Sequence, residues 1–147
     1  MQKPDQTVFY GIEKAIKSYR QFAQKNITDK GFAITIDQGL ILSLIQDYPG
    51  ITQQQIAIRA FKDHASVTRI IENLVSRKLL TRDFHPDDRR RFSLGLSTLG
   101  SETLHQLKPV ASANRKKALK GVSVQELETL KNILDQITEN CTDHEKQ

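Results

Sequence analysis

The stretch from Ile56 to Leu96 constrains the fold more than any other part of this 147-residue chain. Apolar residues recur at i, i+3, i+4 and i+7 over residues 63–77, which predicts an amphipathic helix. These are Val67, Ile70, Ile71 and Leu74. A shorter helical pattern precedes them, and apolar and polar residues alternate over residues 80–84 and 91–96, which predicts two strands. Helix, turn, helix and hairpin in this order predict a winged helix-turn-helix over residues 35–96.

The predicted hairpin, or wing, covers about residues 80–96. Its connection, residues 85–90, has Pro86 for the turn and no apolar side chain, so we expect it to project into solvent. Its tip is predicted to carry Asp88, Arg89, Arg90 and Arg91. Apolar residues at alternate strand positions are expected to face the core: Leu80, Phe84, Phe92, Leu94 and Leu96.

Several helix starts are marked by polar caps. Three Ser/Thr-x-x-Gln/Glu capping boxes are present, at Thr35–Gln38, Thr52–Gln55 and Ser123–Glu126. Asp63 is the expected N-cap of the helix at 63–77. A first long helix is predicted from Asp5 to about Asn26, and two more follow the wing. We therefore predict a mainly α (α+β) chain with one domain over residues 1–147, in which helices over residues 5–30 and 97–141 flank the winged part; the resemblance described below implies that these are dimerisation helices.

The charge of the chain is concentrated in the predicted winged segment. The whole chain has 22 Lys and Arg against 17 Asp and Glu, a formal net charge of +5. Residues 57–92 contain nine Lys and Arg against five Asp and Glu, so four of the five excess charges lie there. A basic surface permits a polyanionic partner without requiring one.

Other function classes find little support. The single cysteine, Cys141, excludes an internal disulfide and a multi-cysteine zinc site. The four histidines are scattered without metal-ligand spacing, and no glycine-rich phosphate loop is present, so we expect no catalytic residue, metal or cofactor. The polar residues Met1–Thr7 and the lack of a long apolar run predict a cytoplasmic protein that contacts no membrane.

The face of helix 63–77 opposite the apolar stripe is polar and is the first candidate for DNA binding. Arginine and asparagine can read guanine and adenine edges in a major groove, and hydroxyls near a helix N-terminus suit phosphates. The candidates are His64, Ser66, Thr68, Arg69, Asn73 and Arg77. A solvated helix face also carries such residues by chance, but the basic hairpin that follows favours the DNA interpretation. A wing arginine can enter a narrow minor groove, held in one geometry by a neighbouring carboxylate.

Six aromatic residues lie in the first third of the chain. A core role is the better interpretation, and the alternative is a small-molecule pocket, for which the candidates are Tyr10, Tyr19, Phe22 and Phe32.

The chain resembles the multiple-antibiotic-resistance-regulator (MarR) family of bacterial transcription regulators from about Phe9 to Cys141. The matching residues are the Thr35-x-x-Gln38 opening, residues 63–69, Leu74, Leu79, Arg82, the wing pattern at 86–91 and Leu96-Ser97-Thr98-Leu99-Gly100. The pair Asp88-x-Arg90 followed by Leu96-Ser97-x-x-Gly100 is specific in combination.

The resemblance implies a homodimer whose first and last two helices interlock, with each winged part contacting half of a palindromic operator. By position, Ser66, Thr68 and Arg69 would contact the major groove, and Thr52 and Gln54 the DNA backbone. Arg90 would enter the minor groove, with Asp88 orienting it or a neighbouring arginine. Such proteins mostly repress transcription, and a small aromatic or lipophilic ligand bound between the dimerisation helices and the winged part often releases them.

Two residues depart from the family pattern. Lys78 stands where the family usually has glycine, which implies either a strained helix cap or a different exit towards the wing. The first helix has no cysteine, which excludes oxidant sensing by the route that some members use. The alternative function is a winged-helix protein-interaction module, an antirepressor or adaptor, whose basic face binds an acidic partner without specific DNA binding.

Overall fold

The computed structural model describes residues 1–142, apart from the side chains of His85, Arg89, Arg90 and Arg91. Contacts between residues divide the chain into two units, Met1–Asn114 and Arg115–Gln147. The second unit contains the end of helix α5 (Thr98–Ala118) and helix α6 (Val124–Thr142). Each unit is described by itself below.

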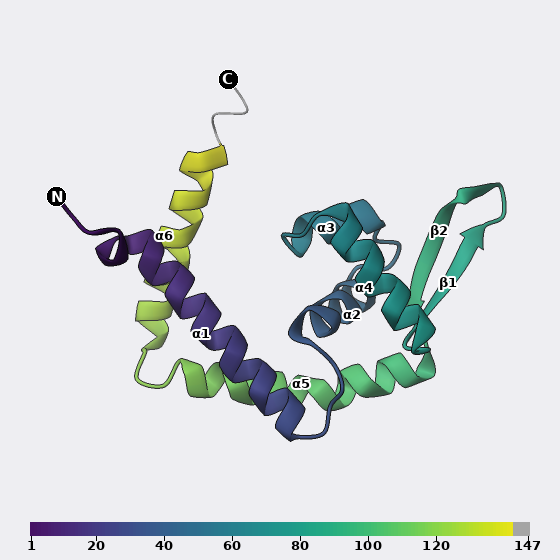
Figure 1. The fold of residues 1–147 in the computed structure, drawn as a ribbon, viewed down its shortest axis with the longest axis horizontal. Helices are drawn as coiled ribbons and strands as arrows, with labels where there is room; N and C mark the ends of the chain where they lie inside the picture. The colour runs from purple at the N-terminus through teal and green to yellow at the C-terminus, as the bar shows by residue number, and fades with distance from the viewer. Residues whose placement is uncertain (143–147) are drawn as a thin grey trace. The chain divides into compact units, whose positions relative to one another are not determined.

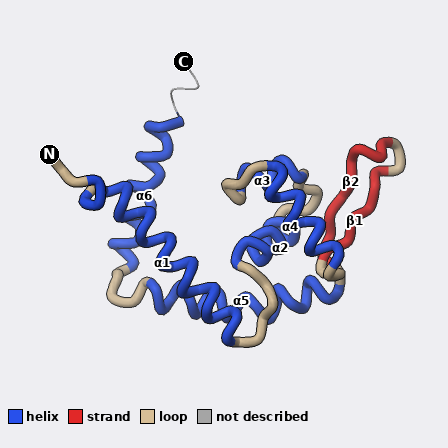
Figure 2. Tube along the Cα trace, in the orientation of Figure 1, coloured by secondary structure: helices blue, strands red, loops and turns tan. Residues whose placement is uncertain are grey.

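Besides most of α5, the first unit contains a 3-10 turn, four α-helices and one hairpin among its described residues (Figure 1). In chain order they are the 3-10 turn η1 (Pro4–Gln6), α1 (Val8–Asp29), α2 (Ile36–Asp47), α3 (Gln53–Arg59), α4 (His64–Ser76), β1 (Leu80–His85) and β2 (Asp88–Leu96). α4 is the predicted recognition helix. The hairpin is the only sheet among the described residues and stands out in Figure 2. The winged helix-turn-helix predicted from the sequence is therefore confirmed.

The helices begin where polar caps satisfy their first N–H groups. The Thr35 hydroxyl accepts from the Gln38 N–H at 3.0 Å, and Gln38 Oε1 accepts from the Thr35 N–H at 2.9 Å. The box at Thr52–Gln55 has the same two bonds. The first helix starts three residues later than predicted, because Pro4–Gln6 form the 3-10 turn and Thr7 is the N-cap.

The core of the first unit lies where α2, α3, α4 and α5 meet. Its fully buried large side chains are Ile41, Leu42, Ile56, Val67, Ile71, Leu74 and Leu104. α2 and α5 approach closely, since a Cβ on Gly39 would lie 3.0 Å from Cδ2 of Leu107. The predicted stripe of α4 therefore faces inward, with Ile70 packed at the margin of this core.

The hairpin differs from its prediction at the turn. The strands pair from Leu80↔Leu96 to Phe84↔Phe92, and a bulge after Phe84 allows His85 to pair with Asp88. The pairing therefore continues past the predicted end of the first strand, and only Pro86 and Asp87 lie between β1 and β2. Residues 89–91 of β2 have no partner in this register. Asp88–Arg91, which were predicted to lie at the hairpin tip, directly follow the turn at the far end of the hairpin, and the structure assigns them to the start of β2.

The prediction that Phe84 faces the core is wrong. Leu80 is 2% exposed, whereas Phe84, on the same face of the strand, is 60% exposed. The hairpin extends beyond the helical core, so only the residues near its base can be buried there. Phe84 instead packs edge-on against Phe92, with ring centroids 6.4 Å apart, and the Arg82 guanidinium lies 5.1 Å from the Phe92 ring.

The end of α4 decides between the two alternatives predicted for Lys78, a strained helix cap or a different exit towards the wing. Its φ is 62°, the left-handed conformation that favours glycine. The Lys78 N–H donates to the carbonyl of Val75 and the Leu79 N–H to that of Leu74, at 3.0 and 2.9 Å, which is the Schellman pattern of a helix end. The chain thus keeps the cap geometry and places a lysine in the strained position.

In the second unit, too, a polar cap marks the start of the helix. Ser123 and Glu126 form the predicted capping box of α6, through bonds of 2.9 and 3.1 Å. No helix among residues 1–142 is both long enough and apolar enough to cross a lipid bilayer.

Candidate nucleic-acid interface

Asp63 fixes the N-terminal turn of α4. Its Oδ1 accepts from the Ser66 N–H at 2.7 Å and its Oδ2 from the Ser66 hydroxyl at 3.0 Å. The backbone and hydroxyl hydrogen bonds from Ser66 lower the pKa of the Asp63 carboxyl. The Ser66 hydroxyl hydrogen is thus used within the helix, and its lone pairs remain for an outside donor.

Gln53, the first residue of α3, connects the two helices of the helix-turn-helix. Its Nε2 donates to the Thr68 hydroxyl and lies 3.4 Å from Nε2 of His64. Thr68 also donates to the backbone carbonyl of His64 at 2.9 Å. The predicted base-contacting hydroxyl of Thr68 is therefore largely engaged inside the protein. Gln53 was not predicted as a site residue from the sequence, where it directly follows the Thr52 cap.

Arg69 is the candidate of α4 that is most available to a partner. It is exposed, and it makes no hydrogen bond or ion pair with the side chains that the structure describes. It lies about one turn after Ser66, and His64 is exposed at the first position of the helix. We call these three residues the outward surface of α4.

Asn73 and Arg77, in contrast, are held by the protein itself. Asn73 Oδ1 accepts from Gln38 Nε2 at 3.0 Å, across 35 residues of chain. Arg77 donates to Gln38 Oε1 at 3.4 Å and to the backbone carbonyl of Ala33. Both side chains remain exposed, but their direction is set by α2 and by the loop before it.

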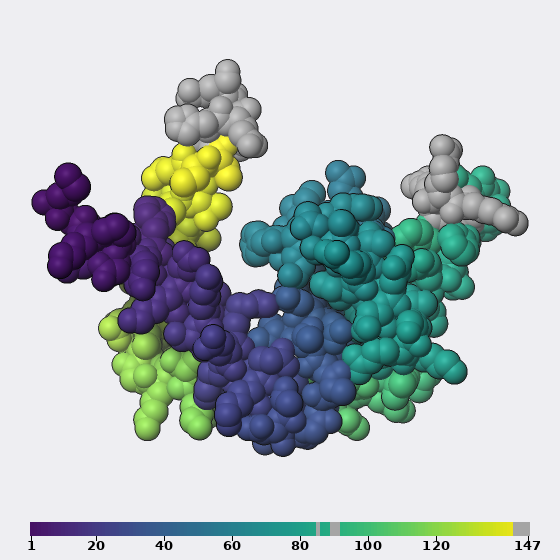
Figure 3. All heavy atoms as spheres, viewed as in Figure 1, coloured from purple at the N-terminus to yellow at the C-terminus, as the bar shows by residue number. Residues whose placement is uncertain are grey.

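The other predicted contacts are divided between α3 and the wing. Thr52 caps α3, and Gln54 is exposed in the first turn of that helix. Asp88 begins β2, where its backbone pairs with His85. Arg89, Arg90 and Arg91 follow in the same strand, and their side chains lie outside the described residues. Figure 3 shows α3, α4 and the hairpin as one continuous surface.

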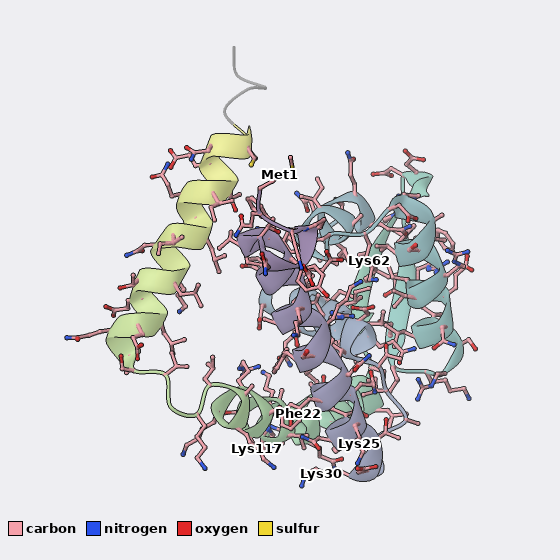
Figure 4. All side chains as sticks on the ribbon, turned by 60° about the vertical axis from the view of Figure 1, so that its left-hand side comes forward. Met1, Phe22, Lys25, Lys30, Lys62 and Lys117 are labelled. Carbon is pink, nitrogen blue, oxygen red and sulfur yellow. The ribbon has the colours of Figure 1, made fainter. Side chains whose placement is uncertain are left out.

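A cavity of about 250 Å³ lies between the loop before α2, the end of α4 and the start of α5. Phe32, Arg77, Leu79 and Leu99 are among the residues that line it. Of the four aromatic residues proposed for a pocket, Phe32 lines this cavity. Tyr10, Tyr19 and Phe22 lie along α1 instead, and Phe22 is labelled in Figure 4. No group of three or more metal-ligating side chains is found among the described residues.

Comparison with known proteins agrees with this arrangement. The MarR family model matches residues 34–92, which contain α2 to α4 and most of the wing. A candidate transcriptional regulatory protein for the hcr operon of Thauera aromatica is 31% identical over 94 residues. That alignment covers 63% of this chain and 54% of the relative, so the chain spans about half the length of the curated relative.

Solved structures share the fold over nearly the whole chain. Bordetella bronchiseptica BpsR, whose DNA binding is regulated by 6-hydroxynicotinic acid, aligns with a TM-score of 0.84 and 22% identity over 95% of this chain and 98% of BpsR. Staphylococcus aureus MepR, solved with DNA, aligns with a TM-score of 0.82 and 22% identity, over 95% of this chain and 100% of MepR. The chain therefore matches the MarR family model over its winged segment and shares its fold with these solved regulators.

Proposed function

We propose that this chain is a DNA-binding transcriptional regulator, a homodimeric repressor that binds a palindromic operator. The observation that carries the proposal is the outward surface at the start of α4, where exposed Arg69 follows His64 and Ser66 on a helix whose opposite side is buried. A helix of this kind fits a major groove, and an arginine there can donate two hydrogen bonds to guanine.

The wing would add minor-groove contacts. The run Arg89–Arg91 follows the two-residue turn of a hairpin that extends beyond the core, and it supplies three of the nine basic residues of the winged segment. Arginine is attracted by the negative potential of a narrow minor groove. Arg90 is the residue we assign to this contact, with Asp88 orienting it or a neighbouring arginine. Thr52 and Gln54 would contact phosphates beside the major groove.

A homodimer is supported by the apolar surface of α1. Val8 and Phe9 are 66% and 62% exposed, and Tyr10, Ile12 and Ile16 are exposed as well. An exposed apolar row of this length marks an interface in most proteins. A second copy of the chain would cover it and would bring two recognition helices to successive major grooves, about 34 Å apart.

Release by a small ligand is supported by the position of the cavity beside Phe32. Arg77 lines the cavity and also donates to the Ala33 carbonyl, so a bound molecule would contact the end of the recognition helix directly. A ligand that binds only one arrangement of α4 shifts the population towards it and so changes DNA affinity. An aromatic or lipophilic molecule fits this aromatic and aliphatic lining. In BpsR, the molecule that regulates DNA binding is likewise aromatic, 6-hydroxynicotinic acid.

Selection of bound duplexes from a random pool tests the proposal. The expected result is a palindromic motif whose half-sites are separated by about one helical turn. A pool without any enriched motif after repeated selection would instead favour the protein-interaction module, in which the basic face binds an acidic protein.

A further inference from the structure

The first turn of α2, residues 35–38, contacts elements on both sides of it in the chain. We call these four residues the α2 turn. On one side it meets α1: Gln24 Nε2 donates to the Ile34 carbonyl at 3.1 Å, and Gln24 Oε1 accepts from the Ile36 N–H at 2.9 Å. A single side chain of α1 thus binds the backbone immediately before and after Thr35.

Asp37 extends this contact to the helix-turn-helix. Its Oδ1 accepts from Arg20 of α1 at 2.7 Å, and its Oδ2 pairs with Lys62 at 3.0 Å. Lys62, labelled in Figure 4, lies in the turn directly before α4. Burial would raise the pKa of Asp37, but the hydrogen bonds from Arg20 and Lys62 outweigh it and hold that pKa below its ordinary value.

Gln38 makes the corresponding contact at the other end of α4. Its Nε2 donates to Asn73 and its Oε1 accepts from Arg77, while the same Oε1 completes the cap of α2. α4 has 13 residues, so the two contact points are separated by about 20 Å along the helix. The α2 turn therefore binds the recognition helix near both of its ends and binds α1 at the same time.

We propose that the α2 turn sets the position and direction of the recognition helix, with Asp37 and Gln38 as positioning residues, and that it links α4 to α1. The proposal rests on the proposed function, because the orientation of α4 matters for reading DNA. A helix fixed at two distant points cannot rotate or tilt independently of its support. Any movement of α1 relative to α2 would then change how α4 is presented.

Shelter from solvent distinguishes the Asp37–Lys62 ion pair from ordinary surface pairs. The side chains of Asp37 and Lys62 are 24% and 25% exposed. In the pair Lys25–Asp29 on α1, the exposed fractions are 78% and 60%. Exposed pairs contribute little to stability, and sheltered ones are less weakened by water and salt. Asp29→Asn is therefore a matched control for Asp37→Asn.

The change of charge and the loss of positioning predict opposite effects of Asp37→Asn on DNA affinity. Asp37→Asn raises the net charge by one, and the electrostatic attraction to phosphates alone would tighten binding to every duplex. The positioning role predicts weaker binding to the selected duplex in spite of this charge. We expect the ratio of affinities for selected and scrambled duplexes to fall about tenfold in Asp37→Asn, and to stay within about twofold in Asp29→Asn. An unchanged ratio in Asp37→Asn, or an equal loss in Asp29→Asn, would overturn the proposal.

A second measurement needs no DNA. Hydrogen exchange of the full chain should become faster over residues 60–68 in Asp37→Asn and should not change there in Asp29→Asn. If the wild-type chain prefers no duplex, the proposed function fails, and the exchange rates still decide whether the α2 turn holds α4. Unchanged exchange over 60–68 in Asp37→Asn contradicts the positioning role.

A double-mutant cycle tests whether Asp37 links the two sides. Arg20→Gln and Lys62→Gln each remove one partner of the carboxylate. The link predicts that each substitution has little further effect on the affinity ratio once Asp37 is asparagine. Fully additive effects would mean that Arg20 and Lys62 act independently of Asp37, and would overturn the link.

Discussion

The hydroxyl of Ser97 donates a 2.6 Å hydrogen bond to the backbone carbonyl of Lys78, directly after the recognition helix. The same hydroxyl accepts from the Gly100 N–H at 2.9 Å, so it also caps the start of α5. The Ser97 N–H donates to the Leu79 carbonyl at 3.2 Å. Ser97 thus joins the end of α4 to the beginning of α5, and the wing leaves and returns at this junction.

Gly100 is required by the same junction. A Cβ on Gly100 would lie 2.0 Å from the carbonyl oxygen of Leu79, a distance that forces the backbone to move. We expect Gly100→Ala to lower the free energy of unfolding by about 3 kcal/mol, measured by urea denaturation. Gly11→Ala is the control, because its Cβ would meet nothing within 4 Å and alanine favours the helix. Equal stability of the two variants would contradict the close approach.

Because Lys78 adopts a strained backbone conformation, its replacement by glycine should stabilise the protein. Lys78→Gly should raise the free energy of unfolding by about 1 kcal/mol, because glycine adopts a φ of 62° without the steric cost of a Cβ. Lys78→Ala removes the charge and keeps the Cβ, so it should not stabilise the protein. Both variants are compared with the wild type in urea at one protein concentration. Stabilisation by alanine to the same extent would show that charge, not φ, was responsible.

Asp37 should make stability depend on pH in a defined direction. Its folded pKa lies below the ordinary value of 3.8, so its contribution is complete above that value and is lost as the pH falls through the folded pKa. Unfolding free energies of wild type and Asp37→Asn, measured from neutral to acid pH, should therefore converge at the acid end. A constant difference across the whole range is the outcome that this prediction does not allow.

The exposed apolar residues of α1 predict that the chain must dimerise in order to bind DNA tightly. Ile12→Glu places a charge among them and should shift the chain from dimer to monomer in sedimentation at micromolar concentration, with weaker binding to a palindromic duplex. Lys17→Gln, on the charged side of the helix, lowers the net charge by one as Ile12→Glu does and is the control for charge. A wild-type chain that sediments as a monomer would remove the basis for this prediction.

Local rules account for what the sequence predicted well. The boxes at Thr35, Thr52 and Ser123 predicted helix starts correctly, because a cap depends on residues only three positions apart. The buried stripe of α4 followed from helical periodicity alone. Lys78 was recognised as an unusual residue, and the structure assigns it to the strained cap rather than to a different exit.

The errors and omissions concern distant contacts. The partners of Asn73 and Arg77 are 35 to 44 residues away, so no local pattern could indicate that these side chains are held by α2 and its preceding loop. Phe84 alternates correctly for a buried residue, but burial depends on how far the core extends along the hairpin. The turn was predicted too long because a bulge, which extends the pairing, has no clear sequence signal here.

The central claim is that the outward surface of α4 reads base sequence, and Arg69→Ala tests it most directly. The measurement is the affinity for the selected duplex and for a scrambled duplex at the same salt concentration. We predict a loss of about ten- to a hundredfold on the selected duplex and at most a few-fold on the scrambled one. Arg115→Ala, which removes an equal charge from an exposed position on α5, should change the two affinities equally and little. Equal losses on both duplexes in Arg69→Ala would contradict the claim, because Arg69 would then contact only phosphates.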